Sequence, residues 1–242
     1  TSKGAPKTAL NPIKYIDDDL FGYMDARAGE DGAAGTSNVR TSPVRVESLL
    51  ALATYKGDLD YATNFMGKKI GLNPNIFETE IHSGVYRGTV LIELDRVGIE
   101  HIVEEEKEGK KIISRKLKLK NLVDNEEKAK RVNAFLDALQ MLWSSGRQSR
   151  FLADISPKFI AAAMMKSKNP IFLESVKLRE DDGQIDIAAL NSVVTDYNKF
   201  IDKRLFAVQE AVFNKQDGMV SLSEGFEALQ EWVNDFYGLK KS

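Results

Sequence analysis

Two kinds of hydrophobic periodicity alternate along this chain, and together they restrict it to a fold that mixes helices and strands. Between Val85 and Val97 apolar and polar residues alternate with a two-residue repeat, which predicts a β-strand. The sequence KLKLK predicts a second strand at Arg115–Leu122 for the same reason. After Asp124 the apolar residues change to helical spacing, and Asp124 with Glu127 is an acidic analogue of a helix capping box.

Other segments complete a pattern of strands and helices. Residues 1–39 are expected to be mostly loop, including the flexible stretch Gly29–Gly35, and Val44–Tyr55 a strand passing into a short helical turn. Repeated Gly and Pro residues in Gly57–Asn75 predict a projecting hairpin or arm. The helix after Asp124 is expected to stop at Gly146. The remaining predicted elements are strands at Phe151–Met165 and Ile171–Leu178 and helices at about Asp186–Phe213 and Ser223–Tyr237. This order favours an α+β domain with an antiparallel sheet that carries helices on one face.

Length and composition exclude several classes of protein. A chain of 242 residues is long enough for one large domain with a real hydrophobic core. Its longest apolar run, Phe159–Met165, is far shorter than a membrane span, and the polar residues around Lys3 and Lys7 do not suggest a signal peptide. The absence of cysteine excludes disulfides and thiolate chemistry and agrees with a cytoplasmic location. No cofactor is expected.

Charge is distributed unevenly although the formal total is only −2. Between Lys107 and Arg131 there are ten Lys and Arg residues against four Asp and Glu. Acidic runs occur at Glu104–Glu106 and Asp17–Asp19. Such a chain could associate head to tail, acidic face against basic face, and still leave a basic groove for a polyanion.

Acidic and nucleophilic motifs give weak indications of catalysis. Asp17–Asp19 could bind a divalent cation, but an acidic patch at a helix start or an interface is the favoured interpretation. Asp58 and Asp60 could activate a phosphodiester through a metal, although solvated turn residues are the simpler explanation. His82 and Ser83 lack an orienting acid at a recognised spacing, and no nucleotide-binding glycine motif occurs. No catalytic or metal-binding residue is therefore predicted.

Cationic side chains indicate scattered phosphate contacts rather than one deep pocket. The segment WSSGRQSR combines Arg147 and Arg150 with small residues after a helix, which suits phosphate oxygens as well as it suits a solvated loop. Arg40 and Arg45 in RTSPVRV have the same two interpretations. So have the lysines of KLKLK, which could equally protect an edge strand from aggregation, while Lys68 and Lys69 add two positive charges on the arm.

Five blocks of sequence, read in order, resemble a known family. They are IDDDLFGYM (Ile16–Met24), RTSPVRVESLLAL (Arg40–Leu52), GDLDYATN (Gly57–Asn64), ETEIHSGVYRGTVLIELDRVG (Glu78–Gly98) and SSGRQSRFLADISPKFIAAAM (Ser144–Met164). Over about residues 11–178 the chain is similar to the backbone subunit of the type I-B CRISPR Cascade complex, the DevR family of the RAMP superfamily.

The resemblance implies a fold and a function. It implies one RRM-like (ferredoxin-like) palm over residues 1–242, a finger-like or web insertion at about 17–55 and a thumb-like arm at about 57–81. Such subunits are non-catalytic and stack as a helical filament on the guide RNA (crRNA), beside other Cascade subunits, while the guide pairs with target DNA. The family's glycine-rich loop corresponds to Gly146–Arg150. The residues expected to contact RNA are Arg40, Arg45, Lys68, Lys69, Arg87, Arg147, Arg150 and Lys158.

Two other functions remain open from the sequence. Related backbone subunits of type III complexes cut target RNA with a thumb aspartate, so Asp58 or Asp60 with Mg²⁺ is an alternative. An autoregulatory DNA-binding protein is a further alternative, although no helix-turn-helix is recognisable.

Overall fold

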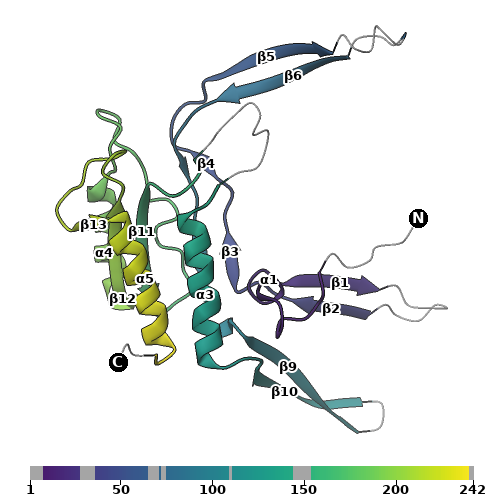
Figure 1. The fold of residues 1–242 in the computed structure, drawn as a ribbon. Helices are drawn as coiled ribbons and strands as arrows, with labels where there is room; N and C mark the ends of the chain where they lie inside the picture. The colour runs from purple at the N-terminus through teal and green to yellow at the C-terminus, as the bar shows by residue number, and fades with distance from the viewer. Residues whose placement is uncertain are drawn as a thin grey trace.

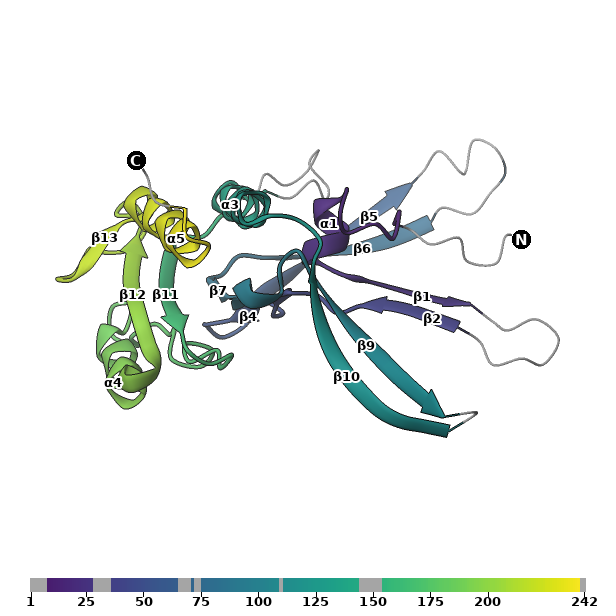
Figure 2. The same ribbon diagram turned by 90° about the horizontal axis from the view of Figure 1, so that it is seen from below.

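Helices packed on a three-stranded sheet form the body of the protein, and three β-hairpins extend away from it (Figures 1 and 2). The computed structural model describes residues 8–27, 36–64, 71, 75–108, 111–143 and 154–239. The predicted flexible stretch Gly29–Gly35 lies outside these ranges. The chain is thus a mixed α+β protein, as predicted.

The sheet of the body has the order β11 (Phe159–Met165), β12 (Ile201–Val208) and β13 (Met219–Ser221). β11 is antiparallel to β12, which is parallel to β13. The sequence of β11, FIAAAMM, contains no polar residue, as expected for a strand that is covered on both faces.

Helices cover both faces of this sheet, so the prediction that helices lie on one face is wrong. On one face, α5 (Leu222–Phe236) lies so close to β12 that a Cβ atom at Gly225 would stand 2.4 Å from the Cβ of Ala207. On the other face, α4 (Ile187–Tyr197) contributes Leu190 and Val194 to the cluster that contains Phe206. In Figure 2, α5 lies near one end of β11 and β12 and α4 near the other.

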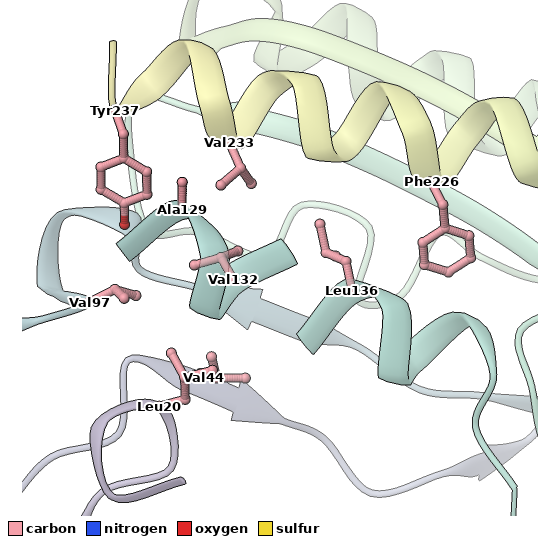
Figure 3. Close-up of a cluster of buried hydrophobic side chains, with 9 residues drawn as sticks. All are labelled: Leu20, Val44, Val97, Ala129, Val132, Leu136, Phe226, Val233 and Tyr237. Atoms are coloured by element: carbon pink, nitrogen blue, oxygen red, sulfur yellow. The ribbon is translucent and has the colours of Figure 1, made fainter. Parts of the chain in front are cut away.

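A second hydrophobic cluster joins the body to the N-terminal half of the chain. Its central element is α3 (Asn125–Gln140), which lies between α5 and the segments around α1 (Ile16–Leu20) and β3 (Val44–Val46) (Figure 3). Its buried residues are Leu20, Val44, Val97, Ala129, Val132, Leu136, Phe226, Val233 and Tyr237.

The three hairpins carry most of the remaining strand structure. They are β1 (Tyr23–Arg27) with β2 (Thr36–Arg40), β5 (Gly57–Asn64) with β6 (Asn75–His82), and β9 (Ile99–Glu108) with β10 (Lys111–Asn121). Two short strand pairs connect the hairpins to the body, namely β3 with β8 (Val90–Ile92) and β4 (Leu50–Ala51) with β7 (Tyr86–Arg87). Two single 3₁₀ turns are also present, η1 (Leu94–Arg96) and η2 (Asn198–Phe200).

Several predicted elements are confirmed. The projecting arm is the β5–β6 hairpin, and KLKLK lies in β10. The helix after Asp124 is α3, where the Asp124 carboxylate accepts a hydrogen bond of 2.8 Å from the backbone N–H of Glu127. It ends at Gln140, and Gly146, the predicted stop, is outside the described residues. The final predicted helix is α5, and Ser221 and Glu224 form its capping box.

The predicted helix at about Asp186–Phe213 is wrong in its second half. α4 ends at Tyr197, and after the η2 turn the chain continues as β12. The stripe of apolar residues suits helical spacing, but β12 pairs with β11 along its length, and this long-range pairing overrides the local pattern.

Four other segments differ from the local predictions. Within 1–39, the described residues of α1, β1 and most of β2 are helix or strand rather than loop, and the predicted helical turn after β3 is replaced by β4. The single strand predicted at Val85–Val97 is divided into β7, β8 and η1. Ile171–Leu178 consists of turns followed by an isolated bridge at Leu178, because β12 rather than this segment pairs with β11.

A buried carboxylate in α1 ties these parts together. Asp19 is fully buried and forms ion pairs with Arg40 of β2 and, at 2.8 Å, with Arg131 of α3. Its two oxygens also accept hydrogen bonds of 3.0 and 3.1 Å from the backbone N–H of Gly98. Gly98 has a φ of +63°, and a Cβ there would stand 2.6 Å from the Val123 side chain, so glycine is required at this turn.

Among the helices that the structure describes, none has the length and apolar character that crossing a bilayer requires.

We predict that Asp19→Asn destabilises the protein by about 3–5 kcal/mol, because it removes the buried carboxylate that the Arg40 and Arg131 guanidinium groups share. The free energy of unfolding in urea measures this loss. Asp17→Asn is the matched control, since Asp17 lies in the same helix but is exposed, and its change should stay within about 0.5 kcal/mol. Equal losses for the two variants would contradict the role given to Asp19.

Candidate nucleic-acid interface

A second buried carboxylate, Glu93, gathers three cationic side chains at the surface. Only 2% of the Glu93 side chain is exposed. Its oxygens form ion pairs with Arg45, with Arg96 at 3.2 Å and with Lys168 at 2.7 Å. We call Arg45, Arg96 and Lys168 the Glu93 cation cluster.

Local structure explains how these residues meet. Arg45 lies in β3 opposite Leu91 of β8, and Glu93 directly follows β8. The backbone N–H of Glu93 donates to the carbonyl of Pro43 at 2.9 Å, which holds the start of η1 against β3. Arg96 in η1 also donates to the carbonyl of Thr41 at 3.3 Å. Lys168 arrives from the segment after β11, so the cluster joins the sheet of the body to the N-terminal half of the chain.

The cluster carries excess positive charge toward solvent. Lys168 also pairs with Asp95 at 3.0 Å, so three cations share two carboxylates. The side chains of Arg45 and Lys168 are 53% and 50% exposed. Since a guanidinium has five N–H donors and an ammonium has three, each can hold Glu93 and still offer donors to an external anion. This arrangement suits phosphate oxygens.

Electrostatics keep Glu93 ionised. Burial by itself would raise the pKa of Glu93, but hydrogen bonds from Lys168 and Arg96 outweigh it and lower the pKa below its usual value. The hydrogen bond to Glu93 in turn raises the pKa of Lys168. Glu93 and Lys168 are therefore both charged at neutral pH.

The structure separates two arginines that the sequence treats alike. Arg45 belongs to the exposed cluster, whereas Arg40 is only 9% exposed. The Arg40 guanidinium donates to the carbonyls of Asp19 at 3.2 Å and Ile99 at 2.9 Å as well as to the Asp19 carboxylate. All three of its nitrogens thus donate to groups inside the fold.

The other described candidates also have internal partners. Arg87 in β7 donates to the carbonyl of Val176 at 3.2 Å, and its Nε is buried. Lys158 pairs with Asp154 and donates to the Ser156 hydroxyl at 2.9 Å. The structure brings neither residue into the Glu93 cation cluster. Their predicted RNA contacts remain predictions. The candidates Lys68, Lys69, Arg147 and Arg150 lie outside the described residues.

The lysines of KLKLK face an acidic strand. Lys118 donates to Glu104 at 3.1 Å and Lys120 lies 3.9 Å from Glu100, both across the β9–β10 ladder. Lys116 stands opposite Glu104 in the register of the same pair of strands. The acidic run that precedes KLKLK therefore neutralises much of its charge.

Possible metal ligands do not gather in the described part of the chain. Within the described residues, no three His, Asp or Glu side chains form a group that could hold a metal ion. Asp58 lies in β5, where its carboxylate accepts a hydrogen bond of 2.9 Å from the Leu59 N–H. The triplet Asp17–Asp19 lies in the first turn of α1, as the favoured interpretation of an acidic patch at a helix start predicts, but only Asp17 is exposed and the other two are buried.

Sequence reasoning missed three members of the site. Glu93 and Arg96 are three residues apart in ELDRVG, and their side chains meet because η1 is a helical turn. The two-residue periodicity predicts a strand there, and in a strand these two side chains would point to opposite faces. Lys168 is 75 residues from Glu93, and no local pattern indicates that contact.

Comparisons with known proteins point to one family. The family model of the CRISPR-associated negative auto-regulator DevR/Csa2 matches residues 7–183, which is most of the chain. A protein of Myxococcus xanthus (strain DK1622), described as CRISPR-associated protein Cas7/Cst2/DevR, is 24% identical over 182 residues. The match covers 73% of this chain and 51% of that protein, so the chain spans about half the length of this curated relative.

We predict that Glu93→Gln destabilises the protein by about 1–3 kcal/mol at pH 7, because it removes the carboxylate that the three cations share. Since the pKa of folded Glu93 is lowered, the stabilisation is complete above about pH 4.3, the ordinary value for glutamate, and is lost as the pH falls through the lower folded value. The difference from wild type should therefore shrink in acid. Urea unfolding from pH 7 down to pH 3 measures it.

Asp95→Asn is the control for this prediction, since Asp95 touches the same Lys168 but is exposed. Its effect should stay within about 0.5 kcal/mol. A loss for Glu93→Gln that does not depend on pH would contradict the ionic role of Glu93.

Proposed function

Because the chain belongs to the DevR/Csa2 family of CRISPR-associated proteins, we propose that it is a non-catalytic, crRNA-binding backbone subunit of a type I-B Cascade complex. The observation that carries the proposal is the Glu93 cation cluster. In a CRISPR-associated chain it provides an exposed, positively charged surface whose side chains are held in place by a buried carboxylate.

The proposed mechanism is binding to the sugar–phosphate backbone of the guide. Arg45 and Lys168 contact phosphates through the donors that Glu93 leaves free, and these contacts do not depend on base identity. Base pairing between guide and target then supplies sequence specificity. Further copies of the chain bind along the same RNA, beside other Cascade subunits, and the RNA joins many weak sites into one assembly.

The fold supports the proposal in outline. Under the proposed function, the sheet β11–β12–β13 with α5 and α4 belongs to an RRM-like palm, and the β5–β6 hairpin is the thumb-like arm. The segment at about 17–55, which includes the β1–β2 hairpin, is the finger-like or web insertion.

We predict that Arg45→Gln with Lys168→Gln reduces the salt dependence of single-stranded RNA binding. Each lost phosphate contact should lower the slope of log K against log salt by about 0.7, so the double variant should lose about 1.4. Fluorescence anisotropy of a labelled RNA across a salt series measures the slope.

Lys215→Gln is the matched control, because Lys215 pairs with Glu210 in the loop between β12 and β13, away from the Glu93 cation cluster. Its slope should equal that of wild type. Circular dichroism must show that the double variant is folded. A folded double variant with the wild-type slope would remove the cluster from the RNA site.

The glycine-rich loop is tested separately. Arg147→Ala with Arg150→Ala should lower the slope by a similar amount if this loop also binds phosphate, as the family resemblance implies. An unchanged slope would exclude the loop and leave the Glu93 cation cluster unaffected.

A second function is suggested by the description of the matching family as a negative auto-regulator. In that function the chain would bind duplex DNA upstream of its own gene. Specific binding of a duplex by the isolated chain at physiological salt, in preference to single-stranded RNA, would support it over the backbone role.

Cleavage would contradict the non-catalytic proposal. The assembled complex is incubated with RNA complementary to the guide, with Mg²⁺ or with EDTA. We expect no cuts. Regularly spaced cuts that need Mg²⁺ and disappear in Asp58→Asn or Asp60→Asn would instead assign metal-dependent ribonuclease activity to the arm.

A further inference from the structure

Three aromatic rings meet at the base of the β5–β6 hairpin, outside the Glu93 cation cluster. Tyr55 precedes β5, His82 ends β6 and Tyr86 begins β7. The ring centroids of Tyr55 and His82 are 5.4 Å apart at an interplanar angle of 61°. Those of His82 and Tyr86 are 5.9 Å apart at 58°. The three rings therefore form one contact group with the edge-to-face and tilted geometry that aromatic pairs prefer.

The chain is built to hold the Tyr55 ring in this place. A Cβ atom at Gly57 would stand 1.8 Å from the Tyr55 hydroxyl, so the ring lies directly over the Gly57 backbone, and a larger residue there would displace the ring. The hydroxyl donates to the Glu80 carboxylate on the neighbouring strand. This hydrogen bond raises the pKa of Tyr55 to about 12, so the phenol stays neutral at physiological pH.

These fixed rings are nevertheless open to solvent. Tyr55 is 56% exposed, Tyr86 is 39% exposed, and His82 is also exposed. Large aromatic side chains gain most free energy when they are buried, so an exposed group of three held in register suggests a ligand that covers them.

The charges around the rings favour a base over a phosphate. The Glu80 carboxylate lies at the edge of the Tyr55 ring and would repel an anion placed on it. Lys56, exposed and adjacent to Tyr55 in sequence, can neutralise a phosphate at the margin of the surface. A neutral, flat group with a phosphate beside it is an unpaired nucleotide, and unpaired bases are recognised by stacking on Tyr and His rings.

We propose that Tyr55, His82 and Tyr86 form a stacking surface for an unpaired nucleobase of single-stranded RNA. The inference rests on the proposed function, because it assumes that RNA lies along this side of the protein. It adds a contact to bases where the Glu93 cation cluster contacts only phosphates. Since every base has an aromatic face, this contact also leaves the guide sequence unrestricted.

The test compares two single-stranded probes of equal length, an oligoadenylate and an abasic analogue with the same ribose–phosphate backbone. The full chain carrying Tyr55→Leu with Tyr86→Leu should bind the oligoadenylate at least about tenfold more weakly than wild type, because the leucines remove the stacking rings. Its affinity for the abasic probe and its salt slope should not change, because no phosphate contact is removed.

Two further variants separate stacking from folding. Tyr55→Phe with Tyr86→Phe keeps both rings and should keep most of the affinity for oligoadenylate. Tyr197→Leu removes a partly exposed tyrosine of α4, on a different part of the molecule, and should bind both probes like wild type.

Each outcome is decisive. An equal loss of affinity for both probes, or no loss for either, would overturn the stacking surface; the second result would leave a protein partner as the occupant of the rings. Failure of the proposed function looks different, since the wild-type chain would then bind neither probe in a salt-dependent way.

Discussion

The buried carboxylate of Asp19 is the interaction on which the arrangement of the N-terminal half depends. It connects α1 to β2 through Arg40, to α3 through Arg131 and to the turn before β9 through the N–H of Gly98. Two arginines against one aspartate would leave a buried positive charge, but Arg131 also pairs with Glu127 at 2.9 Å and donates to the carbonyl oxygens of Pro12 and Ile13. The charges balance and the donors are used, which is the condition for a stable buried ion pair. The hairpins β1–β2 and β9–β10 both extend from this point.

Glu93 repeats the arrangement with a different result. Each carboxylate is buried and gathers cations from distant segments, but the arginines around Asp19 are buried, whereas Arg45 and Lys168 around Glu93 are about half exposed. The first site therefore stabilises the fold, while the second holds positive charge at the surface. At the second site the buried carboxylate holds the cations in place, and their solvent-facing N–H donors stay available. Arg40 and Arg45 are five residues apart in RTSPVRV, and only this difference in depth distinguishes a structural arginine from a candidate phosphate contact.

Local signals in the sequence predicted the parts of the fold that local interactions determine. The Asp124 cap of α3, the Ser221 start of α5, the alternation in β10 and the glycines around the arm all act within a few residues. β9 was not predicted, because an acidic run has low strand propensity and becomes a strand here through pairing with the basic β10. The apolar spacing in β12 predicts a helix, because its partner β11 lies about forty residues away in sequence and local spacing does not reveal the pairing. For the same reason the sequence predicts only part of the site. It indicates Arg45 as an isolated cation, whereas Glu93 and Lys168 come close to Arg45 only through the tertiary fold.

Internal pairing also explains how a chain with a formal charge of −2 can have a cationic surface. Acidic residues form ion pairs with particular cations, as Glu104 does with Lys118 and Asp154 does with Lys158. The total charge is therefore a sum over such pairs and does not describe the electrostatic field at any one place on the surface. At the Glu93 cation cluster a small positive excess remains, three cations against two carboxylates, and the proposed function assigns this excess to RNA. A small excess on each copy gives weak binding by one copy and strong binding by several copies on the same RNA, because each bound copy adds its contacts to a single connected ligand. Under the proposed function, weak sites of this kind favour RNA long enough for several copies over short fragments that hold only one.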